Sequence, residues 1–200
     1  MTMTLSKDEL RRELRARLRA LSPAERETAA GEIERRVWTV PEVAGARVLL
    51  LYASLPEEVP TDGIAREAWR RGIVVVYPRC VVNTREMTLH ALERLEALRA
   101  GSFGIREPDE TVCPLVSVEK IDAVLVPGLG WDRRGGRIGR GAGYYDRLFA
   151  DARWRGFRCG IFFAVQEAPE VPVDPWDTPL DAVVTERETI HPGSGGPPTL

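Results

Sequence analysis

The chain has very few of the residues that build transition-metal centres and nucleophilic triads. Only two of its 200 residues are histidines, His90 and His191, which excludes a histidine-rich metal site and argues against a Ser-His-Asp triad. The three cysteines, Cys80, Cys113 and Cys159, are far apart and form no CxxC pair. They predict neither a zinc knuckle nor a disulfide framework, and they fit the reduced thiols of a cytoplasmic protein.

Long apolar runs and a strong excess of one charge are also missing. No apolar stretch approaches the roughly 20 residues that cross a bilayer, and the charged N-terminus lacks an apolar signal core. The formal net charge is only -2, which argues against a protein that coats nucleic acid. We therefore expect a cytoplasmic monomer that binds neither nucleic acid nor membrane, and any anion site must be local.

The sequence does contain an alternation of helical and strand patterns. Two amphipathic helices are expected near the start, with capping residues at Ser6 and Ser22. Further helices are expected from Thr61 or Asp62 to Gly72 and from Tyr144 to Ala150. Continuous apolar runs predict strands that are buried on both faces, namely Val48–Leu51, Ile73–Tyr77, Ile121–Val126 and Cys159–Val165.

Strands that alternate with helices in this way predict an α/β sandwich with a mainly parallel central sheet. A weaker strand is expected at Met87–Leu92 and a short edge strand at Asp181–Val184. The length predicts a single domain over residues 1–189, and the Pro/Gly-rich segment 190–200 is expected to be a disordered tail.

The segment Arg133–Asp146 carries most of the functional information. It contains five glycines and four arginines and leads into the helix expected from Tyr144. Glycines let a backbone approach a ligand closely, and guanidinium groups match phosphate oxygens. Because the segment follows a strand and precedes a helix, we expect its N–H groups to meet a polyanion. It matches neither a Walker A loop nor a dinucleotide fingerprint, and a solvated basic loop is the alternative.

Three other clusters accompany this loop. Tyr52–Thr61 supplies an aromatic ring and a carboxylate, Glu58, that suit an amino-pyrimidine edge, although a plain βα loop has the same pattern. Gly101–Pro108 is a turn followed by an extended segment, and Lys7–Arg11 is a charged helix start. At the end of the Gly/Arg loop, Asp146 can reach a magnesium ion or simply interact with the helix dipole.

In this order, the clusters resemble the 5-formyltetrahydrofolate cyclo-ligase family, also called 5,10-methenyltetrahydrofolate synthetases. The resemblance extends from about Ser6 to Thr185. Its pieces are Lys7–Arg11, Tyr52–Thr61, Gly104–Pro108 and Val126–Asp132 running into Arg137–Asp146. Trp131 stands where the family more often has phenylalanine.

The resemblance implies a three-layer α/β/α fold and an ATP- and Mg²⁺-dependent reaction. 5-Formyltetrahydrofolate would be cyclised to 5,10-methenyltetrahydrofolate with release of ADP and phosphate. In that reaction ATP phosphorylates the formyl oxygen, and N10 then attacks the formyl carbon. No covalent nucleophile on the protein is needed, so catalysis is mainly alignment and charge neutralisation.

The resemblance also implies roles for individual residues. The ATP-binding set would be Lys7, Arg11, Arg137, Ile138, Gly139, Arg140, Gly141, Ala142, Gly143, Tyr144 and Tyr145. The folate-binding set would be Ala53, Glu58, Arg140, Gly141, Ala142, Gly143 and Tyr144. Asp146 and Asp181 would hold magnesium, and Arg140 and Tyr144 would be catalytic.

Two other functions stay open at this point. One is an ATP-dependent ligase or kinase of the same fold that acts on a different heterocycle. The other is a nucleotide- or RNA-binding module of this fold without ligase activity. Glu58, the arginines of the loop and Asp146 favour the cyclo-ligase, because a module that had lost the chemistry would not need them.

Overall fold

A mixed sheet of seven strands forms the centre of the molecule in the computed structural model, which describes residues 5–193. The strand order is β11-β10-β9-β6-β1-β2-β3. Neighbouring strands from β10 to β2 are parallel, while β11 and β3 pair antiparallel at the two edges. The strands are β1 (Val48–Leu50), β2 (Val74–Val81), β3 (Glu86–Leu92), β6 (Ala123–Val126), β9 (Phe157–Ile161), β10 (Ala182–Val184) and β11 (Thr189–Ile190).

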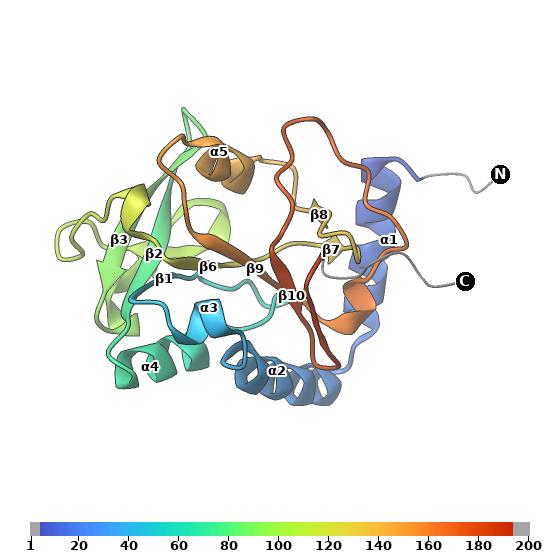
Figure 1. Ribbon diagram of the computed structural model, residues 1–200, viewed down its shortest axis with the longest axis horizontal. Helices are drawn as coiled ribbons and strands as arrows, with labels where there is room; N and C mark the ends of the chain where they lie inside the picture. The colour runs from blue at the N-terminus through green and yellow to red at the C-terminus, as the bar shows by residue number, and fades with distance from the viewer. Residues whose placement is uncertain (1–4, 194–200) are drawn as a thin grey trace.

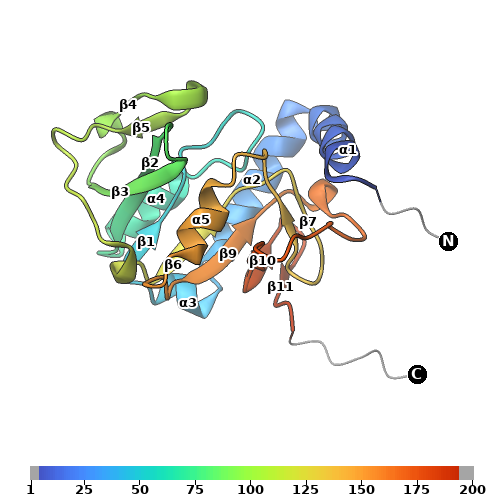
Figure 2. The ribbon, with the colours of Figure 1, turned by 90° about the horizontal axis from the view of Figure 1, so that it is seen from above.

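Helices cover both faces of this sheet (Figures 1 and 2). One face carries α2 (Pro23–Val37), α3 (Pro41–Ala44) and α4 (Asp62–Arg70), and the other carries α5 (Tyr144–Ala150). The α/β fold with a mainly parallel sheet, and its three layers, are thereby confirmed. Within residues 5–193, no helix has the length and apolar character needed to cross a membrane.

The strands bury side chains on both of their faces, which explains their continuous apolar runs. In β1, Leu49 belongs to the cluster under α2, α3 and α4, whereas Leu50 belongs to the cluster under α5. Val75 and Val76 of β2 divide in the same way. Since both sides of a central parallel strand are covered, neither side needs polar residues.

The first helix, α1 (Lys7–Ala20), lies at one end of the sheet, and two small hairpins complete the fold. Both expected caps are present: the Ser6 and Ser22 side chains form capping boxes with Glu9 and Glu25. The remaining elements are β4 (Leu98–Ala100), β5 (Arg106–Pro108), β7 (Gly130–Trp131) and β8 (Arg137–Ile138), with short 3₁₀ helices at Leu95–Ala97, Ser102–Gly104, Val118–Lys120 and Ala164–Gln166.

Two expectations for the C-terminal part of the chain are wrong. β10 is not an edge strand, because β11 pairs with it antiparallel through Val183 with Ile190 and Val184 with Thr189. Ile190 therefore belongs to the sheet rather than to a disordered tail. A strand of two residues is too short to show alternation, so no sequence pattern predicts it. Residues 194–200 of the expected tail lie outside the described residues.

A buried carboxylate, Asp132, joins the β7–β8 hairpin to the rest of the protein. It is 1% exposed and accepts hydrogen bonds from the backbone N–H groups of Arg134 and Gly136, both at 2.9 Å, and of Val171 at 2.8 Å. The turn and the second strand of this hairpin form the first part of the Gly/Arg loop, Arg133–Asp146. Asp132 thus fixes the base of that loop.

We expect Asp132→Ala to lower the free energy of unfolding by about 3 kcal/mol, because three backbone N–H groups, two of them in buried hydrogen bonds, would lose their acceptor. Urea unfolding followed by circular dichroism measures the change. Asp122→Ala is the matched control, since Asp122 also accepts from two backbone N–H groups but its side chain is 32% exposed and water can replace it. Equal losses in the two variants would contradict the role given to Asp132.

Candidate active site

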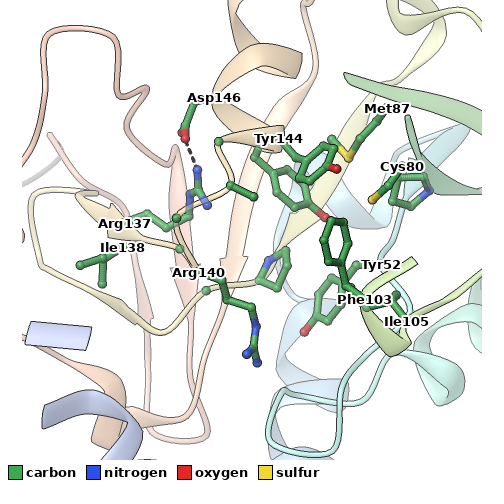
Figure 3. A pocket seen from close by; sticks show the side chains of 18 of the residues that line it. Tyr52, Cys80, Met87, Phe103, Ile105, Arg137, Ile138, Arg140, Tyr144 and Asp146 are labelled. Carbon is green, nitrogen blue, oxygen red and sulfur yellow. Dashed lines mark hydrogen bonds and ion pairs between the residues drawn. The ribbon is translucent and has the colours of Figure 1, made fainter. Parts of the chain in front are cut away.

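A cavity of about 610 Å³ opens beyond the carboxyl ends of β1 and β6 (Figure 3). Its walls come from the start of α1, the segment after β1, the strands β2 and β3, the turn before β5 and the Gly/Arg loop. All four clusters of the sequence therefore meet in one place. Every residue expected at the site lines this cavity, with the exception of Asp181.

The Gly/Arg loop owes its shape to glycines. Gly141 has φ +102° and Gly143 has φ +72°, a left-handed region that other residues adopt at a cost. Gly143 is also the N-cap of α5. In the described part of the chain, the backbone N–H groups of residues 139–143 donate no hydrogen bond to another protein group. They are available to a ligand that accepts hydrogen bonds.

An ion pair joins the two ends of the 137–146 part of this loop. Arg137 Nη2 donates to Asp146 Oδ1 at 2.7 Å, and the Arg137 side chain is only 7% exposed. Its Nε is buried without a hydrogen-bond partner, and its guanidinium lies 5.6 Å from the centroid of the Tyr145 ring. Nη2 of Arg137 is therefore fixed on Asp146, while Nε remains available to donate a hydrogen bond to a ligand.

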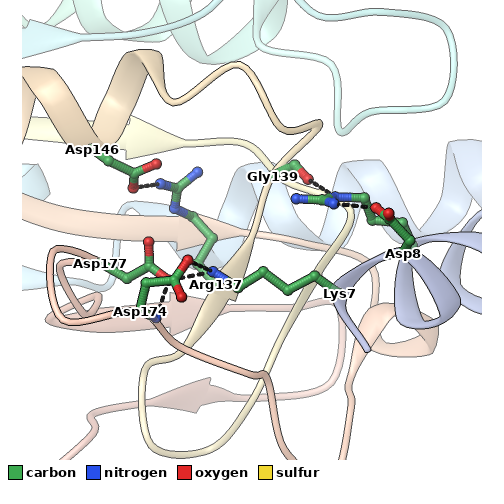
Figure 4. Close-up of polar contacts among 8 residues, drawn as sticks. Lys7, Asp8, Arg137, Gly139, Asp146, Asp174 and Asp177 are labelled. Carbon is green, nitrogen blue, oxygen red and sulfur yellow. Dashed lines mark hydrogen bonds and ion pairs between the residues drawn. The ribbon is translucent and has the colours of Figure 1, made fainter. Parts of the chain in front are cut away.

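The first helix adds two more cations to this wall (Figure 4). Arg11 donates through Nε to the Gly139 carbonyl at 3.1 Å. Lys7 Nζ donates to Asp174 Oδ2 and Asp177 Oδ2, both at 2.7 Å. Burial disfavours the Lys7 ammonium, but hydrogen bonds and charges of the two aspartates outweigh it and raise the pKa of Lys7. Lys7 therefore stays charged at neutral pH.

The close approach of α1 depends on a glycine in β7. A β-carbon at Gly130 would lie 2.3 Å from Leu14 Cδ1 and 3.0 Å from the Gln166 carbonyl oxygen. A larger residue would force the buried Leu14 side chain of α1 to shift. Because α1 carries Lys7 and Arg11, this contact also sets where the two cations lie.

The opposite wall of the cavity is organised around Glu58. Its Oε2 accepts from the Leu55 N–H at 3.0 Å, and its Oε1 accepts from Arg140 Nε at 3.2 Å. Arg140 also donates through Nη2 to Glu57 at 2.7 Å. Burial raises the pKa of Glu58, and the Leu55 N–H and Arg140 only partly oppose it. Arg140 is not a free surface side chain, since it bridges two carboxylates across the cavity.

The sharp turn around Glu58 is built by neighbouring side chains. Tyr52 donates its hydroxyl hydrogen to the Val59 carbonyl at 2.7 Å, and the Thr61 hydroxyl donates to the Tyr52 carbonyl. Thr61 precedes α4, but its hydroxyl makes this bond instead of capping the helix. Tyr52 and Ala53 are thus held as part of the cavity wall, next to Glu58.

The rest of this wall is mainly apolar. Phe103, Ile105, Met87 and Cys80 line it, and the Phe103 ring meets Tyr144 edge-on with centroids 6.2 Å apart (Figure 3). Burial, assisted by the charge of nearby Glu107, raises the pKa of the Cys80 thiol to about 11. The thiol stays protonated at neutral pH and does not supply a nucleophile.

Asp181 lies elsewhere, and its expected place in a metal site with Asp146 is corrected by the structure. It directly precedes β10, so it lies at the amino edge of the parallel strands, whereas the cavity lies at the carboxyl edge. Its carboxylate pairs with Arg158 through Nε at 2.8 Å and Nη2 at 2.6 Å. It lines a separate depression that also contains Asp122.

Two cavity residues that sequence reasoning missed are Asp174 and Asp177. They lie in an irregular segment with no periodic pattern, and only their contact with Lys7 reveals that they belong to the site. Among the residues that the structure describes, no three His, Cys, Asp or Glu side chains gather into a group that could hold a metal ion by itself.

Comparisons with known proteins agree with this geometry. The model of the 5-formyltetrahydrofolate cyclo-ligase family matches residues 3–186. The Mus musculus 5-formyltetrahydrofolate cyclo-ligase is 30% identical over 195 residues, which cover 93% of this chain and 96% of the mouse protein. The Escherichia coli K12 enzyme of the same name is 28% identical over 179 residues, covering 86% and 96%.

A solved structure extends the agreement to the fold. The Aquifex aeolicus 5,10-methenyltetrahydrofolate synthetase has a TM-score of 0.82 at 30% identity and covers 98% of this chain and 97% of its own. The similarity thus spans the sheet, the helices and every segment that lines the cavity. On these grounds the chain belongs to the 5-formyltetrahydrofolate cyclo-ligase family.

Proposed function

We propose that this enzyme uses ATP and Mg²⁺ to cyclise 5-formyltetrahydrofolate to 5,10-methenyltetrahydrofolate, with release of ADP and phosphate. The observation that carries the proposal is the Arg140 contact with Glu58. It joins the loop that suits a polyphosphate to the wall that suits a heterocycle, inside one cavity. A reaction that moves a phosphoryl group from one ligand to the other needs this arrangement.

The polyphosphate would lie against the Gly/Arg loop. Lys7, Arg11 and Arg137 supply positive charge from two elements, and the N–H groups of residues 139–143 supply hydrogen-bond donors. The three cations now pair with carboxylates or carbonyls that phosphate oxygens can replace. Charge-assisted hydrogen bonds of this kind are about twice as strong as neutral ones.

Magnesium fits the carboxylates on the same side. Mg²⁺ is usually held by one or two carboxylates together with waters and substrate phosphates, so a dedicated cluster of protein ligands is not required. Asp146 lines the cavity and faces Arg137, while Asp174 and Asp177 line it beside Lys7. We propose Asp146 and Asp177 as the carboxylates nearest the bound ion, which would neutralise phosphate charge.

The pterin would bind on the Glu58 wall. An ionised carboxylate can accept two hydrogen bonds from the amino-pyrimidine edge of a pterin. Tyr52, Ala53 and the apolar residues around Phe103 would contact its flat faces. The Leu55 N–H keeps the Glu58 carboxylate oriented before substrate arrives, which lowers the entropy cost of binding.

The chemistry follows from the poor leaving ability of a formamide oxygen. Transfer of the γ-phosphoryl group to that oxygen releases ADP and makes the formyl carbon electrophilic. The N10 lone pair then bonds to this carbon, the carbon–oxygen bond breaks, and phosphate departs while N10 loses its proton. Arg140, which lies between the two walls, would neutralise the transferred phosphoryl group, and Tyr144 would border it.

One assay tests the proposal as a whole. Purified protein is mixed with 5-formyltetrahydrofolate and Mg-ATP, and the absorbance of the methenyl product is followed. ATP-dependent product formation is expected. A well-folded protein that binds ATP but forms no product would instead be a nucleotide-binding module of this fold.

We expect Arg140→Ala to lower kcat by at least about 100-fold, the usual size of a lost transition-state donor. Its side chain is 35% exposed, so the free energy of unfolding should change by less than about 1 kcal/mol. Arg133→Ala is the control, because Arg133 pairs with Glu167 and Glu188 outside the cavity. Parallel losses of stability and activity in Arg140→Ala would indicate a structural role.

Glu58→Gln should raise KM for 5-formyltetrahydrofolate roughly tenfold or more while KM for ATP stays unchanged, because only a carboxylate accepts both hydrogen bonds. The raised pKa of Glu58 also predicts a pH effect. As pH falls, Glu58 is protonated at a higher pH than an ordinary glutamate, so the folate KM of the wild type should rise on the acid side.

The Glu58→Gln variant should not show this rise of the folate KM at low pH. Glu57→Gln is the matched control, since a hydrogen bond from Arg140 lowers the pKa of Glu57 and keeps it ionised. If the folate KM of Glu58→Gln still rises as the pH falls, another titrating group recognises the folate.

Asp146→Asn should increase the Mg²⁺ concentration needed for half-maximal turnover by about tenfold or more, because one anionic ligand is lost. Excess EDTA should abolish turnover of the wild type, and added Mg²⁺ should restore it. Asp181→Asn should keep the wild-type Mg²⁺ requirement. A shift in Asp181→Asn that matched the shift in Asp146→Asn would contradict the placement of the ion.

A further inference from the structure

Two large aromatic side chains stand exposed on the rim of the active-site cavity. Phe103 is 63% exposed on the Glu58 wall, and Trp176 is 68% exposed on the wall that carries Lys7. The chain's other four tryptophans, Trp38, Trp69, Trp131 and Trp154, are buried or half-buried. Trp176 therefore presents a large flat apolar surface to solvent at the edge of a charged cavity.

The chain holds Trp176 on a well-fixed turn. Asp177 donates its backbone N–H to the Asp174 carbonyl at 3.0 Å, and Asp174 donates its N–H to Asp177 Oδ2 at 2.8 Å. Pro175 restricts the backbone between them. Lys7 Nζ then binds both carboxylates at 2.7 Å and ties the turn to α1. The backbone that carries the indole is therefore held in place before any ligand binds.

We propose that Trp176 is the stacking platform for the purine base of ATP, an inference that rests on the proposed function. Lys7, Arg11 and Arg137 would take the phosphates, so the base must lie at the outer end of that wall. Trp176 is there, on the turn that Lys7 contacts. The Phe103 ring, by contrast, lies on the Glu58 wall with Ile105 and Met87.

The charges around Trp176 select the same ligand. With Lys7 on a phosphate and Mg²⁺ on Asp177, as proposed above, the Asp174 carboxylate is left as an uncompensated negative charge two residues from Trp176. A neutral base tolerates that charge, whereas the carboxylates of a folate glutamate tail would be repelled. Stacking on a flat ring does not distinguish one purine from another, so Trp176 should accept adenine and guanine alike.

The size of the effect follows from base–aromatic stacking. Removing one such contact typically weakens binding by about 5- to 150-fold. Trp176→Ala should therefore raise KM for ATP by a factor in this range. KM for GTP should rise by a similar factor if GTP also serves as the phosphoryl donor. KM for 5-formyltetrahydrofolate and the Kd of inorganic tripolyphosphate should stay unchanged, and Trp176→Phe should recover most of the loss.

The test combines steady-state kinetics with tryptophan fluorescence. Mg-ATP and Mg-tripolyphosphate are titrated against the wild type, Trp176→Ala and Trp176→Phe. ATP should quench the tryptophan fluorescence of the wild type but not that of either variant. Tripolyphosphate should leave the fluorescence of the wild type unchanged. Val173→Ala is the matched control, since Val173 is 63% exposed on the same segment but does not line the cavity.

Three results would overturn the inference. The first is an unchanged ATP KM in Trp176→Ala with turnover intact. The second is a rise in folate KM instead, which would assign the indole to the other substrate. The third is equal weakening of ATP and tripolyphosphate, which would mean that Trp176 only supports the turn. Absent turnover in the wild type would reject the proposed function, while ATP quenching would still report on the indole.

Discussion

The compensation of charge inside the cavity is the interaction on which the rest of the site depends. Arg140 reaches from the Gly/Arg loop to Glu57 and Glu58, Arg137 returns to Asp146, and Lys7 reaches Asp174 and Asp177. The Arg140 and Lys7 pairs connect segments that are distant in sequence, and all the pairs hold a cation where a phosphate oxygen can replace its partner. Since half-buried charges need partners, the same residues stabilise the cavity and prepare it for polyanions.

The rigid parts of the fold give these pairs their geometry. The parallel strands β1 and β6 end at the same edge of the sheet, so the Glu58 segment and the Gly/Arg loop must face one another. Asp132 fixes the hairpin below the loop, and Gly130 lets α1 bring Lys7 and Arg11 close. A flexible loop of glycines can thus deliver its donors to one place, because both of its ends are held.

The cavity divides into a polar side and an apolar side, and this division matches the proposed reaction. Cations, carboxylates and unpaired N–H groups occupy the side of the loop, while Tyr52, Phe103 and Ile105 occupy the other side. Arg140 lies where the two sides meet. Trp176 adds a flat apolar surface at the outer end of the polar side. A nucleotide has the same order of parts, since its flat base lies beyond its phosphates.

The sequence by itself determined six of the seven strands of the central sheet, the caps and the phosphate-suited loop, because apolar runs, Ser–Glu spacing and glycine content act locally. Its resemblance to a family also placed Glu58 and Asp146 in one site. Only the tertiary structure decided that Asp181 lies at the wrong edge of the sheet, that β11 completes it, and that Asp177 meets Lys7 across 170 positions. Such contacts depend on which edge of the sheet each segment reaches, and no local pattern encodes that.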